Sequence, residues 1–514
     1  MLRGAAAGVL GLSAVPLLTS CGTQPPAARG NPTGPPRRGG VLRVGTAGGG
    51  SSDSLDVHNP ITHPDICRGL NLYEPLLYRK RDYTLESCVA ESVEVSKDGL
   101  SWVIRIRDGI LFHNGKPVRP EDVIYTYRRV TDPKKPQAAA NLLSSVDRDG
   151  FSKIDDRTLR IKLKAPDVSI HDVFADYRIG IVPEGYDPKK PIGTGPFTFV
   201  NFTPGQESTF ARFSDYWREG QPYVDELRII NFTDDSARTN ALLAGQVEAI
   251  ESLPYAEVRV IEADPTLRVL KSRTGNWNPF TMRVDVEPLR DVRVRQALRL
   301  SIDREEMVNQ VLSGHGRIAN DMYSPFDDSY AADLPQRTYD PDEAKSLLKA
   351  AGHENLQIEL VTSPVSQGIV EAAQVMQQQA RSAGIGIKLN RVDTGVFYGD
   401  DYLKWHFAQD FWGTWPYLVQ SALGSQPSSP FNECHWVDPT YLDLVGKAKQ
   451  TVDDDKRSRL LEQAQEIEYE RGGYIVWGFL DLVDAYSRRI TGLKPSEKGI
   501  FPLDAYRFRE VWFV

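Results

Sequence analysis

The sequence predicts an α/β protein built from more than one domain. At 514 residues the chain is too long for a single core, so two or three domains are expected. Apolar residues make up 40% and charged residues 25% of the chain, the composition of an ordinary folded soluble protein. Segments of alternating apolar and polar residues are interspersed with segments of helical spacing, which indicates both strands and helices.

The net charge of −8 argues against a nucleic-acid partner. No basic stripe stands out that could neutralise a phosphate backbone.

Residues 1–20 are predicted to be a lipoprotein signal peptide. Arg3 precedes an apolar run, Gly4–Leu18, that is too short to span a bilayer. The run ends in Leu18-Thr19-Ser20-Cys21-Gly22, which resembles the bacterial lipobox. We expect lipid on Cys21 and anchoring at the outer face of the cytoplasmic membrane. The alternatives are a chance cysteine after a cleaved signal, or a longer leader with another export route.

Residues 21–38 are predicted to be a flexible tether, because they are rich in Pro, Gly and Ala and have no apolar periodicity. The other cysteines are Cys67, Cys88 and Cys434. An exported location permits a disulfide, and Cys67 with Cys88 is the nearest pair, bridged or free.

Several local elements can be predicted from the first third of the mature chain. Residues 39–45 alternate like a short strand, and residues 66–78 have helical spacing that breaks at Pro75. Residues 92–107 read as two strands joined at Asp98-Gly99, a hairpin turn pair. A helix is expected to open at Pro120, where proline and acids are start signals.

Two further helices are predicted downstream. Val294, Ala297, Leu298 and Ile302 recur at helical intervals and form one apolar stripe. Asp340 is placed to cap the next helix. Acidic residues interleave the arginines of this region, which favours a solvated, salt-bridged face over a phosphate patch; these arginines are Arg290, Arg293, Arg295, Arg299 and Arg304.

Residues 102–123 resemble the signature of the family 5 extracytoplasmic solute-binding proteins. This is the oligopeptide- and dipeptide-binding class that serves ABC importers. The pattern is a Trp, an alternating strand, Arg-x-Gly, Phe-His-x-Gly and an Asp that opens a helix. The resemblance extends over residues 39–514, and further blocks agree in order: 191–197, 215–227, 242–249, 288–304 and 339–348.

The resemblance implies a type II periplasmic-binding-protein-like fold, with two α/β lobes, a hinge and an extra α/β subdomain in the first lobe. Closure of the lobes over a ligand is the expected motion. Residues 275–284 and 478–487 are the expected hinge segments. The implied parts are lobe I (39–72, 193–275 and 483–514), an inserted subdomain (73–192) and lobe II (276–482).

No catalytic motif was found, so an enzyme and a resident cofactor are not expected. The stretch Gly109–Lys116 resembles a phosphate loop, but Pro117 stands where a magnesium-binding Ser or Thr is required. His58 and His63 lie near three aspartates, Asp53, Asp56 and Asp65, which leaves a metal site as a minor alternative. Histidines scattered in this way serve more often as caps and surface groups, so no metal site is predicted.

The stretch Trp405–Tyr417 is the strongest candidate for a binding site. Six aromatic rings surround Asp410 and a Gly/Pro break. Apolar walls with a few placed polar groups are typical of a ligand pocket. A buried strand that enters a turn is the alternative, since aromatic residues also favour strands.

The resemblance implies a binding site between the lobes. In peptide-binding relatives, an aspartate of the 405–417 stretch pairs with the ligand ammonium. The equivalent position here is Trp412, and Asp410 is the candidate substitute. Arg283 either holds an anionic ligand group or faces solvent. The full set of expected ligand residues is Thr46, Tyr73, Glu74, Trp277, Arg283, Asp410, Phe411, Trp412, Trp415 and Tyr417.

The function implied is that of an extracytoplasmic receptor which captures a peptide or peptide-like solute and delivers it to an ABC permease. The resemblance also implies a monomer. Three alternatives stay open: an oligosaccharide ligand stacked on tryptophans, a sensory lipoprotein without transport, and a nickel complex.

Overall fold

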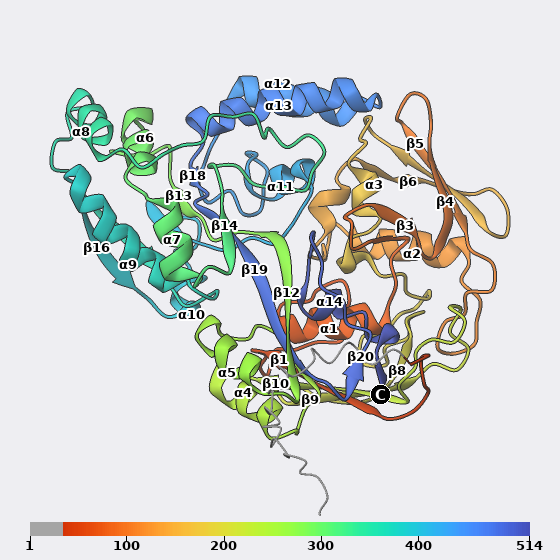
Figure 1. Cartoon of the computed structure of the whole chain (residues 1–514). Helices are drawn as coiled ribbons and strands as arrows, with labels where there is room; N and C mark the ends of the chain where they lie inside the picture. The colour runs from red at the N-terminus through yellow and green to blue at the C-terminus, as the bar shows by residue number, and fades with distance from the viewer. Residues whose placement is uncertain (1–33) are drawn as a thin grey trace, which may run out of the picture. The chain divides into compact units, whose positions relative to one another are not determined.

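The computed structural model describes residues 34–514 of the chain (Figure 1). The predicted signal peptide at residues 1–20, Cys21 and most of the predicted tether lie outside the described residues. Within the described part, no helix has the length and apolar character needed to cross a membrane.

The first lobe is framed by the largest sheet, which has eight strands in the described residues. Its strands, in the order in which they pair, are β12 (Leu267–Asn276), β19 (Gly478–Ser487), β11 (Ala249–Ile250), β1 (Val41–Ala47), β10 (Glu226–Phe232), β9 (Glu207–Arg212) and β8 (Phe197–Thr203), with β14 (Gly316–Ile318) paired to β19 beside this path. β1 runs parallel to both of its neighbours, whereas β8, β9 and β10 form an antiparallel meander.

Two smaller sheets build the second lobe and the inserted subdomain. The second-lobe sheet has the order β16 (Gly386–Arg391), β15 (Gln357–Thr362), β17 (Phe407–Gln409), β13 (Phe280–Met282) and β18 (Tyr474–Ile475). The sheet of the subdomain has the order β4 (Ala90–Val95), β5 (Ser101–Ile106), β7 (Thr158–Leu163) and β6 (Val146–Lys153). Two short antiparallel pairs are β2 (Leu77–Arg79) with β3 (Leu85–Ser87), and β20 (Ile490–Thr491) with β21 (Trp512–Phe513).

The helices are distributed over all three parts. In chain order they are α1 (His63–Leu72), α2 (Pro120–Val130), α3 (Ile170–Val173), α4 (Asp235–Leu243), α5 (Val258–Ala263), α6 (Val292–Leu300), α7 (Arg304–Val311), α8 (Pro341–Ala350), α9 (Ile369–Ala380), α10 (Thr394–Phe397), α11 (Tyr417–Gly424), α12 (Pro439–Gln450), α13 (Asp454–Arg471) and α14 (Pro502–Tyr506). The short 3₁₀ segments are η1 (Ala140–Leu143), η2 (Tyr177–Ile179), η3 (Tyr255–Glu257), η4 (Arg381–Ala383) and η5 (Phe508–Glu510).

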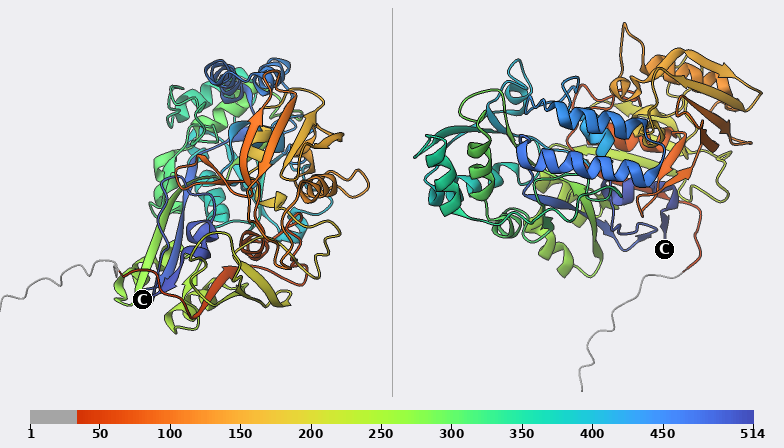
Figure 2. Two further views of the ribbon diagram at one scale, coloured as in Figure 1. Left: turned by 90° about the vertical axis from the view of Figure 1, so that its right-hand side faces the viewer. Right: turned by 90° about the horizontal axis from the view of Figure 1, so that it is seen from above.

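Helices cover both faces of the first-lobe sheet (Figure 1). On one face, Ala241 of α4 shares a core with Ala485 of β19. On the other, Cys67 of α1 shares a core with Val44 of β1. In the second lobe, helices α6 to α9 share a core with the five-stranded sheet, and α12 lies alongside α13 (Figure 2). The layers are those of an α/β fold, as predicted.

Two long strands connect the lobes. β12 and β19 run antiparallel, from the pair Leu267 and Ser487 to the pair Asn276 and Leu480 (Figure 1). β19 also pairs with β14, and β12 leads directly into the second-lobe sheet. Neither predicted hinge segment, 275–284 or 478–487, contains a helix. Residues 36–514 form one compact unit, so the predicted lobe boundaries stay predictions.

Several local predictions are confirmed, each for the expected physical reason. β4 and β5 form a hairpin whose turn holds Gly99 at a φ of +68°. Helix α2 starts at Pro120, and the Asp340 side chain accepts a hydrogen bond from the Glu343 amide of α8. A Cβ on Gly193 would lie 2.0 Å from the Leu72 carbonyl oxygen, so that turn requires glycine.

The prediction of a solvated arginine face is wrong for Arg295, Arg299 and Arg304, which are all buried. Arg295 and Arg299 donate to the Gly472 carbonyl at the end of α13, at 3.3 and 2.7 Å. Carbonyls at a helix C-terminus carry partial negative charge and have no partner within the helix, so they accept guanidinium groups well.

The cysteines are not bridged in the described residues. Cys67, Cys88 and Cys434 are free thiols, each buried in apolar surroundings. Burial raises the pKa of all three thiols well above its ordinary value, so they behave as small apolar groups. The candidate pair Cys67 and Cys88 is therefore corrected to two separate core residues.

Candidate functional site

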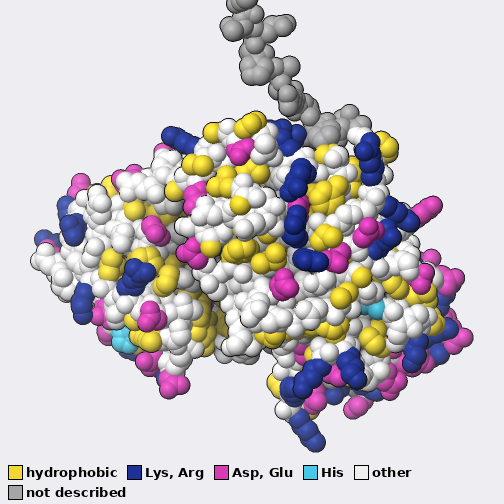
Figure 3. All heavy atoms as spheres, turned by 90° about the horizontal axis from the view of Figure 1, so that it is seen from below, with side chains coloured by type: hydrophobic (Ala, Val, Ile, Leu, Met, Phe, Trp, Pro, Cys, Tyr) yellow, Lys and Arg dark blue, Asp and Glu magenta, His cyan; other side chains and the backbone are white. Residues whose placement is uncertain are grey.

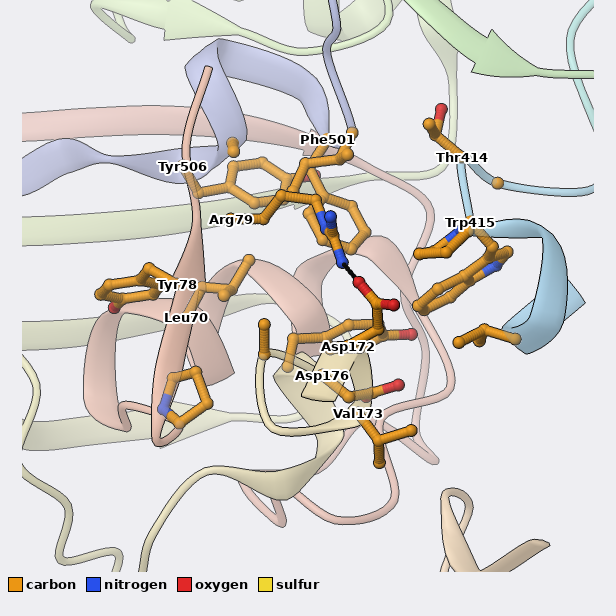
Figure 4. A pocket seen from close by; sticks show the side chains of 18 of the residues that line it. Leu70, Tyr78, Arg79, Asp172, Val173, Asp176, Thr414, Trp415, Phe501 and Tyr506 are labelled. Carbon is orange, nitrogen blue, oxygen red and sulfur yellow. Dashed lines mark hydrogen bonds and ion pairs between the residues drawn. The ribbon is translucent and has the colours of Figure 1, made fainter. Parts of the chain in front are cut away.

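A cleft lies where residues 413–419 of the second lobe meet the first lobe and its inserted subdomain (Figure 4). It encloses about 890 Å³, counted out to its open mouth. Its lining residues come from four separate stretches of the chain, at residues 70–79, 172–177, 413–419 and 500–509.

The second-lobe wall of the cleft is held in place by the hinge. The Thr414 hydroxyl accepts a hydrogen bond from the Gly275 amide at 2.8 Å and donates to Asn276 at 2.8 Å. Trp412 and Trp277 exchange two backbone hydrogen bonds. Four hydrogen bonds therefore fix this stretch to the end of β12 and to the residue that follows it.

Trp415 is the half-buried ring that this wall presents to the cleft. It stacks on Tyr177, with 6.2 Å between ring centroids, and the Arg178 guanidinium lies 5.1 Å from its ring. Phe501 meets Tyr177 edge-to-face at 5.1 Å. Stacked rings and a cation over an indole are favourable contacts. Figure 4 shows Trp415 on the opposite side of the cleft from Tyr78.

The remaining lining carries charge of both signs. Arg79 donates to Asp172 at 2.5 Å and to the Tyr83 carbonyl at 2.8 Å (Figure 4). Asp176 accepts a two-pronged pair from Arg178 at 2.9 and 2.6 Å. These groups are fixed by fully formed ion pairs, which favours rigid positions for polar recognition.

A left-handed turn forms the top of the cleft. Leu503, Asp504, Ala505 and Tyr506 all have φ between +47° and +60°. Such backbone costs roughly 1–2 kcal/mol per residue for non-glycine residues. The turn is held because Asp484 accepts the Leu503 amide at 2.6 Å, and Tyr506 donates to Glu251. Strain that is held by buried contacts clusters at ligand clamps.

Trp415 alone among the ten predicted ligand residues, all within the described part of the chain, lines this cleft. Trp277 and Trp412 are buried, and their rings stack at 6.1 Å. Tyr417 is buried in α11, where its hydroxyl donates to Glu468 at 2.8 Å. Phe411 is 44% exposed and lies outside the lining of the cleft.

Asp410 is 4% exposed and already has internal partners. It accepts from the Tyr398 hydroxyl at 2.7 Å, the Tyr402 hydroxyl at 3.2 Å and the Phe411 amide at 2.8 Å. It also shares a hydrogen bond with Glu433. Burial raises the pKa of both carboxyls, and the two together hold a proton more tightly than either would in water.

The predicted first-lobe contacts are buried and satisfied. The Tyr73 hydroxyl donates to the Leu55 carbonyl at 2.9 Å. Glu74 accepts from Thr194, Tyr216 and Trp217, at 3.1, 2.7 and 2.9 Å. The Thr46 hydroxyl donates to the Ile230 carbonyl at 3.3 Å. The contacts of Tyr73 and Glu74 connect the start of the predicted subdomain to the first lobe, whereas the contact of Thr46 lies between two neighbouring strands, β1 and β10.

Arg283 is neither free nor at the cleft. Its guanidinium is paired with Asp285, at 2.9 Å from Nε and 2.6 Å from Nη2. The same guanidinium donates to the Lys404 carbonyl at 3.3 Å, and Arg283 is not among the residues that line the cleft.

The histidines considered for a metal site have other partners. His58 contacts Arg129 and the Gly180 carbonyl, the latter at 3.0 Å, and burial lowers the pKa of His58 to about 4. His63 lies 3.4 Å from Glu251. Across residues 34–514, no group of three or more His, Cys, Asp or Glu side chains is arranged to hold a metal ion.

Sequence reasoning missed most of the cleft. Tyr177, Phe501, Arg79 and Arg507 line it, and none follows a binding motif. The sequence signal available for them is an aromatic residue followed by an arginine, directly at Tyr177-Arg178 and after six residues at Phe501 and Arg507. Without the tertiary fold, that pattern is indistinguishable from ordinary surface composition.

Three comparisons with known proteins agree with this architecture. The family model for bacterial extracellular solute-binding proteins, family 5 Middle, matches residues 84–430, about two thirds of the chain. The chain is 24% identical over 479 residues to the glutathione-binding protein GsiB of Pectobacterium atrosepticum, with 89% of this chain and 92% of that one covered. It is 27% identical over 478 residues to heme-binding protein A of Haemophilus influenzae, with 82% of each covered.

A solved structure shows the same fold. The ABC transporter-associated periplasmic binding protein DppA of Helicobacter pylori, in complex with the peptide STSA, has a TM-score of 0.79 to this chain at 22% identity. The match covers 93% of this chain and 98% of that one. The predicted type II two-lobe fold is confirmed.

The family and these relatives are solute-binding proteins and not enzymes, so that prediction is also confirmed. Members of the family are extracytoplasmic. The match over two thirds of the sequence and the two-lobe fold together identify the chain: it belongs to the bacterial extracellular solute-binding proteins of family 5.

Proposed function

We propose that this protein captures a peptide or peptide-like solute in the cleft beside Trp415 and delivers it to the permease of an ABC importer. The observation that carries the proposal is the composition of the cleft. Trp415 faces Tyr177 and Phe501 over fixed charges of both signs. A peptide offers apolar side chains, a cationic end and an anionic end, which match rings and paired charges in one site.

The oligosaccharide alternative is weakened by the burial of its tryptophans. Trp277 is 1% and Trp412 is 7% exposed, and both stack on neighbours inside the second lobe. Only rings that reach the cleft can stack on a sugar, and Trp415 is the single tryptophan among the described lining residues.

We further propose that the mature protein begins at lipidated Cys21 and acts as a monomer. The short lipobox-like stretch before that cysteine supports the lipidation. Cys21→Ser should release the protein from the membrane fraction into the soluble exported fraction. Continued membrane association of that variant would remove the anchor from the proposal.

A thermal-shift screen tests the ligand class directly. Di- to pentapeptides and oligosaccharides are compared on the wild-type protein and on Asp410→Ala. A ligand at one hundred times its Kd stabilises the folded state by about 2.7 kcal/mol, so Tm should rise clearly for peptides. Stabilisation by oligosaccharides and by no peptide would contradict the proposal. Equal stabilisation by peptides with and without the Asp410 carboxylate would remove an ammonium-binding role for that acid.

A further inference from the structure

Much of the surface that faces the cleft is apolar and only half-buried. Half-buried apolar side chains from all four stretches of the lining contribute to it, among them Leu70, Ala175, Tyr177, Trp415, Ile500 and Phe501. The fold itself does not cover this surface completely. Contact with an apolar group would remove more of it from water, which is favourable.

The charged residues of the lining, in contrast, are already paired. Each charged side chain in the described lining has an oppositely charged neighbour within 3.4 Å: Arg79 with Asp172, Asp176 with Arg178, Arg507 with Asp504, and Arg509 with Glu510. The first of these pairs is drawn as a dashed line in Figure 4. A charged side chain of the solute would therefore be desolvated in the cleft without a free counter-charge, which is unfavourable.

The position beside the Trp415 ring is also closed to a second cation. The Arg178 guanidinium lies 5.1 Å from the centre of the Trp415 ring and 5.5 Å from the centre of the Tyr177 ring. Cations are attracted to the faces of such rings, and Arg178 already makes this contact from within the protein. A lysine or arginine side chain of the solute would be repelled there.

The aromatic contacts across the cleft indicate what an opening would expose. Trp415 stacks on Tyr177 with 6.2 Å between ring centroids, and Phe501 meets Tyr177 edge-to-face at 5.1 Å. Separation of the lobes would expose the faces of Trp415 and Tyr177 to water. An apolar side chain that enters the cleft covers these faces again, whereas a charged side chain would lose its own hydration.

We propose that the cleft selects peptides by an uncharged, apolar side chain, aromatic or large aliphatic, which lies against Trp415, Tyr177 and Phe501. The inference rests on the proposed function in taking the solute to be a peptide. It adds which peptides are captured. The restriction applies to the side chain that contacts the rings and not to the polar backbone of the peptide.

A tripeptide series tests the selectivity on the wild-type protein. The peptides Ala-X-Ala, with X as Phe, Leu, Ala, Lys or Glu, share one backbone and the same charged ends, so differences in Kd report the central side chain. Burial of a Phe or Leu side chain improves affinity by roughly tenfold or more. By isothermal titration we expect at least that gain for Phe and Leu over Ala, and no gain for Lys or Glu.

Phe501→Ala and Phe411→Ala locate the selectivity. Phe501 lines the cleft, whereas Phe411 is 44% exposed and lies outside the lining. The preference for Phe over Ala at the central position should fall by about threefold or more in Phe501→Ala, because an aromatic pair is lost, and should be unchanged in Phe411→Ala. An unchanged preference in a folded Phe501→Ala would overturn the proposal. If that variant does not fold, the wild-type series decides alone.

A second probe, indole, separates this inference from the proposed function. Equal Kd for all five tripeptides, or tightest binding of the Lys or Glu peptide, would overturn the selectivity while peptide capture stands. Saturable binding of indole that weakens in Phe501→Ala, in a protein that binds no tripeptide, would support the apolar selectivity of the cleft and remove peptide capture. Binding of neither indole nor any tripeptide would overturn the inference.

Discussion

At the scale of single residues, buried polar groups contribute more to the stability of this protein than its exposed charges do. Acidic and basic side chains are interspersed over the face shown in Figure 3. Exposed ion pairs of that kind contribute about 0–1 kcal/mol each. The buried groups have specific partners, and Glu468 in helix α13 is the clearest case.

Glu468→Gln should destabilise the second lobe. The carboxylate is 3% exposed and accepts hydrogen bonds from Tyr323, Tyr417 and Ser425, at 2.8, 2.8 and 2.8 Å for the shortest of each. The glutamine side chain has one acceptor oxygen in place of two. Its NH₂ group would face hydroxyl groups that donate to the carboxylate in the wild type. We expect a loss of roughly 1–3 kcal/mol in the free energy of unfolding, measured with urea.

Glu462→Gln is the matched control, because Glu462 is exposed on the same helix. Its effect should stay within about 0.5 kcal/mol. An equally small effect at Glu468 would show that the three hydroxyl contacts add nothing to stability.

The limits of prediction are also set at the residue scale. The 405–417 stretch was expected to present several rings to a ligand, yet Phe407 and Trp412 point into cores and Phe411 into solvent. The direction of each ring depends on the alternation of side chains in a short strand and on one turn of helix. The Gly/Pro break between these elements means that the sequence does not show on which side each ring falls. Tyr177 and Phe501 complete the cleft from segments more than three hundred residues apart, and no local pattern links them.

At the scale of elements, composition and spacing predicted the secondary structure well. The β4–β5 hairpin, the starts of α2 and α8 and the apolar stripe of α6 all follow from turn, cap and periodicity rules. The burial of the arginines in α6 was not predicted. An interleaved pattern of charges does not show that the C-terminal end of another helix lies beside them.

Gly193→Ala should be strongly destabilising. An added Cβ would lie 2.0 Å from the Leu72 carbonyl oxygen and 2.7 Å from the Tyr73 ring, and backbone there cannot yield easily. We expect a loss of about 2 kcal/mol or more, as for overpacking, in urea unfolding. Gly446→Ala is the control in helix α12, where nothing lies within 4 Å of the new Cβ. It should stabilise by roughly 0.5–1 kcal/mol; destabilisation by both variants to the same degree would contradict the steric explanation.

The left-handed turn at the cleft should make stability depend on pH. Burial raises the pKa of Asp484 to about 7 from an ordinary 3.8, mainly because the carboxylate is desolvated. The folded state therefore binds the proton more tightly than the unfolded state. The stabilisation is complete below about pH 4 and is lost as the pH rises through about 7. Glu251 and His63 face the same group and shift the value in opposite directions.

Asp484→Asn should flatten that profile. We expect the difference in unfolding free energy between pH 5 and pH 8 to shrink by on the order of 1–3 kcal/mol in the variant. Urea unfolding at the two pH values measures it. A variant with the same slope as the wild type would show that another group titrates in this window.

At the scale of the whole molecule, the hinge and the cleft form one mechanical unit. The long strands β12 and β19 join the lobes. The wall that carries Trp415 is attached to the end of β12 through the hydrogen bonds of Thr414. Trp415 already stacks on Tyr177 in this structure, so an opening of the lobes is expected to separate these two rings. Ligand binding and lobe closure are expected to be a single event.

Trp415→Ala is the variant that tests whether the solute binds in the cleft against this wall. Its ring contacts Tyr177 and the Arg178 guanidinium across the cleft, whereas the Phe411 ring lies outside it. Loss of a stacking ring in a binding site costs about 1–3 kcal/mol or more, which is roughly tenfold or more in Kd.

The most direct measurement is an isothermal titration of the best peptide from the screen into the wild-type protein, Trp415→Ala and Phe411→Ala. We expect one saturable site in the wild type, an unchanged Kd in Phe411→Ala and a Kd raised at least tenfold in Trp415→Ala. Equal affinity of the wild type and Trp415→Ala would contradict capture of the solute in this cleft.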